Sequence, residues 1–174
     1  MCYFLYLATP LTLSEVRSMM LPAGLSAHAV DSVERAVLRE LHPAGQLVLR
    51  LLVGACSCDL IRSRGATPRE DERDLRERYR RLGLSREATL RALEIHRVGP
   101  VQRIQPQGGW PSAIAGFVAE HARNAGPTLY FLDFSPGPRL TLSSPPEPTV
   151  ARTVADVRGR PESWLTESRP TLVT

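Results

Sequence analysis

The three cysteines are the residues of this chain whose type and spacing could do chemistry. Cys2 opens an apolar segment at the N-terminus, and Cys56 and Cys58 follow a second apolar segment as Cys-Ser-Cys. Alternate residues of an extended chain point to the same side, so Cys56 and Cys58 can converge on one ion if the backbone bends near Gly54. A neighbouring strand lies about 4.8 Å away and can supply the third thiolate from Cys2. The three cysteines are therefore a candidate soft-metal site.

This convergence depends on how the two cysteine-bearing strands pair. Cys2 starts its strand, whereas Cys56 and Cys58 follow the end of theirs. Parallel neighbours would place the sulfurs at opposite edges of a sheet, and only antiparallel neighbours bring them together. The connection between the two strands is long enough for either arrangement. The site hypothesis thus predicts that the Cys2 strand pairs antiparallel with the strand at 47–53.

Three thiolates suit zinc, copper(I) or an iron-sulfur cluster, and a fourth ligand would close a tetrahedral zinc site. His121 is the best nitrogen donor, because it lies on the apolar face of a predicted helix. A lone histidine on such a face is also typical of a hydrogen-bonded core residue. Asp59 could serve as a ligand or as an acceptor for one. Without a third thiolate, Cys56 and Cys58 would be two half-buried structural thiols.

Two other interpretations of the cysteines remain open. Removal of Met1 would leave Cys2 with a free α-amine, the arrangement of N-terminal cysteine nucleophile hydrolases, in which the amine serves as the base. Asn124, the only asparagine, would then be the candidate for oxyanion stabilisation. Alternatively, the chain is a thiol redox or metal-responsive module. In that case Cys56 and Cys58 react with an oxidant or capture a toxic soft metal, and Cys2 resolves the product.

Three short segments resemble a group of small uncharacterised bacterial proteins. These segments are the opening Met-Cys with the strand ending at 6–9, the Cys-Ser-Cys segment at 53–60, and the apolar segment at 128–132. The proteins of that group begin Met-Cys and carry a Gly-Cys-x-Cys segment after their second strand. Ser57 and Asp59 stand here where glycine is usual in the group. The resemblance implies a shared three-thiol site and no particular reaction.

The basic residues narrow the range of functions. All 22 are arginine, against 18 acidic residues, so the net charge is +4. The absence of lysine excludes Schiff-base chemistry and a Walker-type phosphate site. The arginines over 69–97 alternate with acidic residues, which favours a solvated, salt-bridged surface over a nucleic-acid-binding patch. A fourth interpretation is an interaction protein that uses these arginine-rich helices, with the cysteines incidental. The sequence does not determine a protein partner or a homo-oligomer.

The N-terminal segment is not expected to direct the chain into or across a membrane. It lacks a basic start and a small-residue cleavage site, Pro10 interrupts it, and no other apolar segment is long enough to span a bilayer. Three cysteines, an odd number, without an export signal indicate a reducing compartment. We therefore expect a cytoplasmic protein with no membrane partner.

Apolar periodicity and Gly and Pro positions predict the elements. Strands are expected over 2–8, 47–53 and 128–134, and helices over 14–20, 29–41, 69–82, 85–97 and 110–125. This pattern predicts an α/β or α+β domain over 1–135, with a small mixed sheet of three or more strands covered by helices. Residues 136–174 contain seven prolines and few large apolar groups. They are expected to form a Pro-rich, partly disordered tail.

Overall fold

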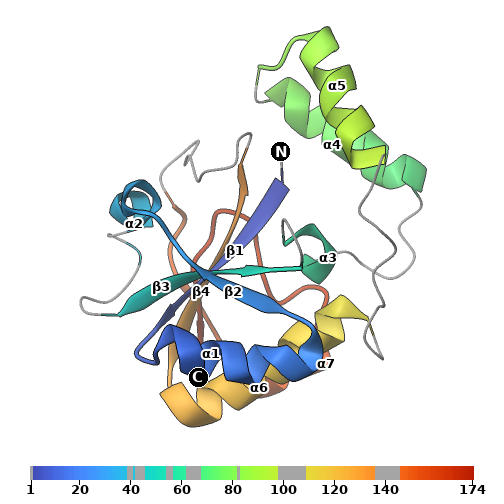
Figure 1. The fold of residues 1–174 in the computed structure, drawn as a ribbon. Coiled ribbons are helices and arrows are strands. Elements are labelled where there is room, and N and C mark those ends of the chain that lie inside the picture. The colour runs from blue at the N-terminus through green and yellow to red at the C-terminus, as the bar shows by residue number, and fades with distance from the viewer. Residues whose placement is uncertain are drawn as a thin grey trace. The chain divides into compact units, whose positions relative to one another are not determined.

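The structure of the chain is a computed structural model (Figure 1). It describes residues 2–38, 41, 46–53, 57–61, 68–81, 83–97, 109–135 and 146–174. The chain divides into two compact units, of which one comprises Met1–Arg62 with Pro106–Thr174 and the other comprises Ser63–Gln105. In sequence, the second unit is an insertion into the first.

The first unit is built on a mixed sheet. Its described residues form six strands in the order β2-β3-β1-β4-β6-β5. The strands are β1 Cys2–Thr9, β2 Ser26–Ala29, β3 Leu47–Leu52, β4 Thr128–Ser135, β5 Val150–Arg152 and β6 Thr171–Val173. All neighbours pair antiparallel except β5 and β6, which are parallel. The α+β class and the mixed sheet expected from the sequence are confirmed.

Helices cover both faces of this sheet. The helical elements of the first unit are α1 Leu13–Met20, the 3₁₀ turn η1 Leu21–Ala23, α2 Ser32–Leu38, α3 Cys58–Ile61, α6 Trp110–Ala125 and α7 Val154–Gly159. Residues of α1, α6 and α7 share one core, whereas Leu38 of α2 belongs to the other. None of the helices that the structure describes is long and apolar enough to cross a membrane.

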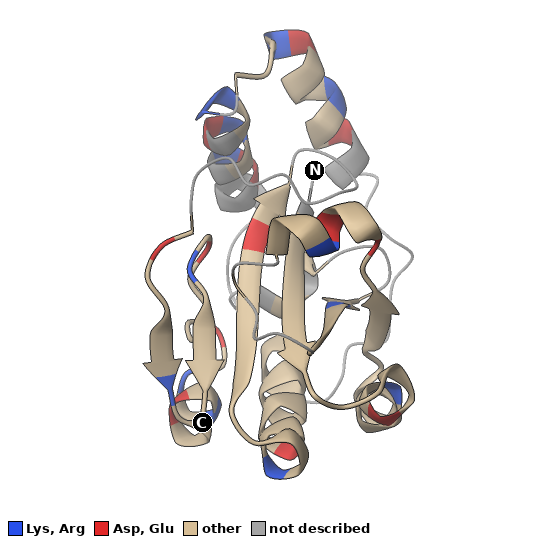
Figure 2. Cartoon of the chain, turned by 90° about the vertical axis from the view of Figure 1, so that its left-hand side faces the viewer, with Lys and Arg blue, Asp and Glu red and all other residues tan. Residues whose placement is uncertain are grey.

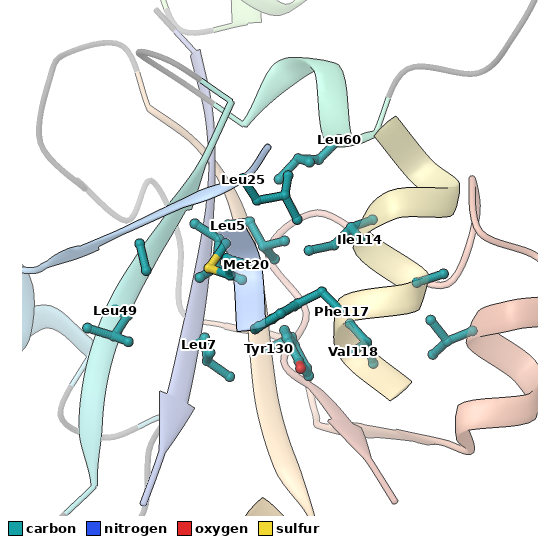
Figure 3. Packing of buried hydrophobic residues seen from close by; sticks show 14 of the residues in the cluster. Leu5, Leu7, Met20, Leu25, Leu49, Leu60, Ile114, Phe117, Val118 and Tyr130 are labelled. Carbon is teal, nitrogen blue, oxygen red and sulfur yellow. The ribbon is translucent and has the colours of Figure 1, made fainter. Parts of the chain in front are cut away.

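The central strand β1 is buried on both faces, as its continuous apolar sequence predicts. Leu5 and Leu7 point into the core with α6, where Figure 3 shows them on the same side as Ile114. Phe4 and Tyr6 alternate with them and join the core with α2. The first residues of the chain are therefore held in the middle of the sheet.

The predicted helix over 29–41 is wrong in its extent. Ser26–Ala29 is instead strand β2, which pairs with β3. Helix α2 begins only after Asp31, because the Oδ1 atom of Asp31 accepts the backbone N–H groups of Val33 at 2.9 Å and Glu34 at 2.8 Å. This later start turns Glu34 into the core and leaves Val33 exposed.

The predicted tail is also wrong for residues 146–174. This segment forms β5, α7 and β6, and β6 pairs with β4. Trp164 is only 3% exposed and packs edge-on against Tyr130, with ring centroids 5.2 Å apart. The few apolar residues of this segment are enough to order it, because they lie in the sheet or the core. Residues 136–145 lie outside the described part of the chain.

The described residues of the second unit form two helices, α4 Pro68–Arg81 and α5 Arg86–Arg97, close to the helices expected there. Gly83 lies between them with a φ of 73°, a left-handed conformation that glycine adopts without strain. The alternating charges form ion pairs, with Glu72–Arg76 at 2.7 Å and Glu77–Arg81 at 3.1 Å. Such exposed pairs support a surface helix and each contribute only about 0.2–0.5 kcal/mol.

Candidate thiolate site

The pairing of β1 with β3 meets the topological condition for a cysteine site. The two strands are antiparallel, with Leu5 opposite Leu51 and Thr9 opposite Leu47. The beginning of β1, at Cys2, therefore lies toward the end of β3 that continues to Cys56. The antiparallel arrangement expected from the site hypothesis is confirmed.

Ser57 holds the cysteine-bearing segment against both strands. Its side chain is fully buried. Its backbone N–H donates to the carbonyl oxygen of Tyr3 at 2.9 Å. Its Oγ accepts the backbone N–H of Leu5 at 2.8 Å and donates to the carbonyl oxygen of Leu51. Ser57 thus continues the hydrogen bonding of β1 beyond the last residues of β3.

Cys58 lies beside the residue that follows Cys2. It is the first residue of α3, and the backbone N–H of Tyr3 donates to its Sγ at a distance of 3.4 Å. The Tyr3 nitrogen is separated from the Cα of Cys2 by two bonds of about 1.3 and 1.5 Å, so the sulfur lies within about 6 Å of that Cα. The structure therefore brings the backbone of Cys2 to the sulfur of Cys58.

The hydrogen bond from the Tyr3 N–H also affects the chemistry of the Cys58 sulfur. Cys58 is partly buried, and the hydrogen bond from Tyr3 fixes the position of its sulfur. Hydrogen bonds to cysteine sulfurs belong to the outer interactions that orient and tune thiolate metal centres. The arrangement at Cys58 is compatible with a ligand as well as with a reactive thiol.

The remaining members of the predicted ligand set are not described. Cys56 lies outside the described residues, and so do the side chains of Cys2 and Asp59. Among the side chains that the structure does describe, no three metal-binding groups gather at one point. The expected separation of the three sulfurs, about 4–6 Å, stays a prediction.

His121 lies at the other end of β1 from Tyr3 and Cys58, so the structure does not bring it to Cys58 as the predicted fourth ligand. Its ring is fully buried, with Nε2 at 2.9 Å from the hydroxyl of Thr9 and Nδ1 at 3.1 Å from the hydroxyl of Thr128. Thr9 ends β1, and the six residue steps from Tyr3 to Thr9 span about 20 Å of strand. Burial lowers the pKa of His121 to about 4, so the ring is neutral near pH 7. His121 is a hydrogen-bonded core residue.

Sequence analysis missed a buried carboxyl group on β4. Asp133, opposite Phe4 of β1, is only 4% exposed. Its Oδ1 accepts the hydroxyl of Ser168 at 3.1 Å, and its Oδ2 has no hydrogen-bond partner among the described residues. Burial, with a smaller contribution from the Glu167 carboxylate, raises the pKa of Asp133 to about 6. In the sequence, this group could have been recognised as the one acidic residue inside the apolar segment 128–135.

A second buried polar group links α2 to the sheet. Glu34 accepts the Tyr6 hydroxyl at 3.1 Å and forms an ion pair with Arg50, which lies opposite Tyr6 across β1 and β3. The Arg50 guanidinium also lies 4.8 Å from the centroid of the Phe4 ring. Burial and the nearby Glu34 carboxylate raise the pKa of Tyr6, which therefore remains a hydroxyl donor. This network anchors α2 to the sheet.

Of the predicted cysteine site, the structure describes the contacts of Ser57 and Cys58 with β1. No protein-family model matches the chain, and no curated protein or solved structure matches it. A function for the cysteines therefore has to be inferred from the geometry around Ser57 and Cys58.

Proposed function

We propose that this protein binds a soft metal ion through the thiolates of Cys2, Cys56 and Cys58. The observation that carries the proposal is the hydrogen bond from the Tyr3 N–H to the Cys58 sulfur, because it joins the segments that hold the first and last of the three cysteines. Zinc is the first candidate, and copper(I) or an iron-sulfur cluster are alternatives.

The sheet supplies the rigidity that such a site needs. Tyr3 and Leu5 belong to the central strand, and Ser57 is hydrogen-bonded to both of them. The backbone at Tyr3, Leu5 and Ser57 is thus positioned by bonds that do not require a metal. Ligands held by such a backbone would bind an ion with less loss of chain entropy than ligands on a flexible loop.

The fourth coordination position is not taken by His121. Asp59, which follows Cys58 directly, or a water molecule would complete a tetrahedral zinc centre. A site with three protein ligands and one water could react with substrates, whereas a site closed by Asp59 would be structural. The proposal itself is limited to metal binding by the three thiolates.

The test is the metal content of protein purified without added metal, measured together with the mass of its N-terminus. We expect about one zinc or copper ion, or one iron-sulfur cluster, per chain. Replacing Cys56 or Cys58 by serine should abolish binding and lower the thermal midpoint, because metal-binding free energy adds to folding free energy. His121→Gln is the matched control: it perturbs the core at the other end of β1 and should keep the metal.

Three outcomes would contradict the proposal. Wild-type protein that takes up none of these metals, even when they are supplied, has no such site. A Cys58→Ser variant with wild-type metal content would show that the ion is bound elsewhere. Absence of metal together with complete removal of Met1 would favour the N-terminal nucleophile instead.

A further inference from the structure

The net charge of this chain resides in its second unit. Residues 63–105 contain 11 of the 22 arginines and 7 of the 18 acidic residues, a net charge of +4. The remainder of the chain contains 11 of each and has no net charge. Figure 2 shows charged residues distributed along both helices of this unit, in contrast to the mostly uncharged strands of the sheet. The inserted helices therefore differ electrostatically from the domain into which they are inserted.

Several arginines of this unit gather at one hollow. This hollow, of about 460 Å³, lies between α4 and α5. The described residues that line it include four arginines and one acidic residue, namely Arg73, Arg76, Arg80, Arg86 and Glu77. Leu90, which is 47% exposed, supplies an apolar wall. The hollow is thus a basic groove with an apolar contact point.

The described residues that line the groove include more arginines than acidic residues, and two of these arginines are in ion pairs. Glu77 binds Arg80 at 2.7 Å, and Arg76 binds Glu72 at 2.7 Å. No carboxylate among the described residues forms an ion pair with Arg86. Exposed pairs of this kind contribute about 0–1 kcal/mol, so an incoming carboxylate can share or replace their acidic partners.

We propose that the groove between α4 and α5 binds an acidic peptide segment that carries an apolar side chain. Guanidinium groups bind carboxylates through two parallel hydrogen bonds, and the four arginines offer several such contacts. Leu90 provides the site for the apolar side chain. The volume of the groove is in the range of small-ligand pockets and holds a few side chains. The proposal does not depend on the metal site.

The lining favours a peptide over a nucleic acid. Single-stranded nucleic acids bind basic grooves that also present aromatic side chains, on which the bases stack. None of the described residues that line this groove is aromatic. An exposed leucine between arginines is instead suited to an amphipathic acidic segment, which pairs carboxylates with an apolar anchor.

The test uses the full chain and a fluorescent peptide of alternating glutamate and leucine, with binding followed by anisotropy at low and physiological salt. A peptide with glutamine in place of glutamate is the ligand control and should not bind. The double variant Arg80→Gln with Arg86→Gln should bind the acidic peptide about tenfold more weakly, because two charge-assisted contacts are lost. Leu90→Ser should also weaken binding.

The matched control is the double variant Arg91→Gln with Arg158→Gln. Arg91 lies on α5 and Arg158 on α7, neither is among the described residues that line the groove, and Arg91 is 75% exposed, compared with 76% for Arg80. The control removes the same charge and should change affinity less than about twofold. Equal weakening by both double variants would overturn the groove proposal, since net charge alone would then attract the peptide. Absence of peptide binding, or tighter binding of a single-stranded oligonucleotide through Arg80 and Arg86, would also overturn it.

Discussion

The backbone N–H of Tyr3 donates a hydrogen bond to the sulfur of Cys58, at 3.4 Å, across 55 residues of sequence. This contact places one cysteine sulfur beside the peptide bond that links Cys2 to Tyr3. It follows from the antiparallel pairing of β1 with β3 and from the position of Ser57 between the two strands. The following predictions test the contacts that create the site and the fold that supports it.

Ser57→Ala should lower both stability and metal affinity. The substitution leaves the buried N–H of Leu5 without its acceptor, which destabilises the fold by about 1–3 kcal/mol. Equilibrium urea unfolding measures this change. The matched control is Ser26→Ala, which removes one partly buried bond to the carbonyl oxygen of Leu52 and should change stability by less than about 1 kcal/mol. Equal effects of the two substitutions would contradict a special role for Ser57.

His121→Gln should make stability less dependent on pH between about 6.5 and 4. The pKa of His121 is lowered to about 4 in the folded chain, compared with 6.5 as its ordinary value, so the unfolded chain binds a proton first as the pH falls. The stabilisation from the neutral ring is complete above pH 6.5 and is lost toward pH 4. Urea unfolding at pH 7.5 and pH 5 should show a smaller loss for the variant than for the wild type. Parallel losses in both proteins would contradict this explanation.

Asp133→Asn should stabilise the protein at pH 8 and have little effect at pH 4. The folded-state pKa of Asp133 is raised from 3.8 to about 6, so the stability contribution is complete below pH 3.8 and is lost as the pH rises through 6. Asparagine stays neutral and should therefore raise the free energy of unfolding at pH 8 by about 1–3 kcal/mol. A gain of equal size at both pH values would show that ionisation is not its cause.

Trp164→Ala should destabilise the fold strongly. Trp164 is buried against Tyr130, and removal of such a ring lowers stability by about 3–5 kcal/mol. Leu21→Ala, at an exposed position, should change stability by less than about 0.5 kcal/mol. Thermal unfolding of both variants provides the comparison. A Trp164→Ala protein as stable as the wild type would indicate that residues 146–174 are a dispensable tail.

The long strands could be predicted from the sequence, whereas the short ones could not. β1, β3 and β4 are mostly apolar segments of six to eight residues, with Arg50 inside β3 and Asp133 inside β4, and burial on both faces favours such a composition. β5 and β6 have three residues each, and β2 has four. Segments of this length carry no periodicity of their own and are stabilised by the strands beside which they lie. Because its strands are so short, the C-terminal segment was predicted from the sequence to be a tail.

The candidate site was predictable only in part. The sequence left the pairing of β1 with β3 open; the hypothesis of a cysteine site required it to be antiparallel, and the structure confirms that it is. The position of His121 on an apolar helix face indicated burial. A helix face does not, however, reveal which end of the sheet its residues contact. Likewise, nothing in the sequence around Ser57 shows that its hydroxyl bridges Leu5 and Leu51. Both His121 and Ser57 are positioned by contacts between segments that are distant in the sequence.

The most direct measurement of the central claim is X-ray absorption spectroscopy of the zinc-loaded protein. The account predicts three sulfur ligands at about 2.3 Å and one nitrogen or oxygen ligand at about 2.0–2.2 Å, with one sulfur fewer when Cys58 is replaced by serine. A first coordination shell of nitrogen and oxygen only, or a sulfur count unchanged in Cys58→Ser, would contradict a metal site built by Cys2, Cys56 and Cys58.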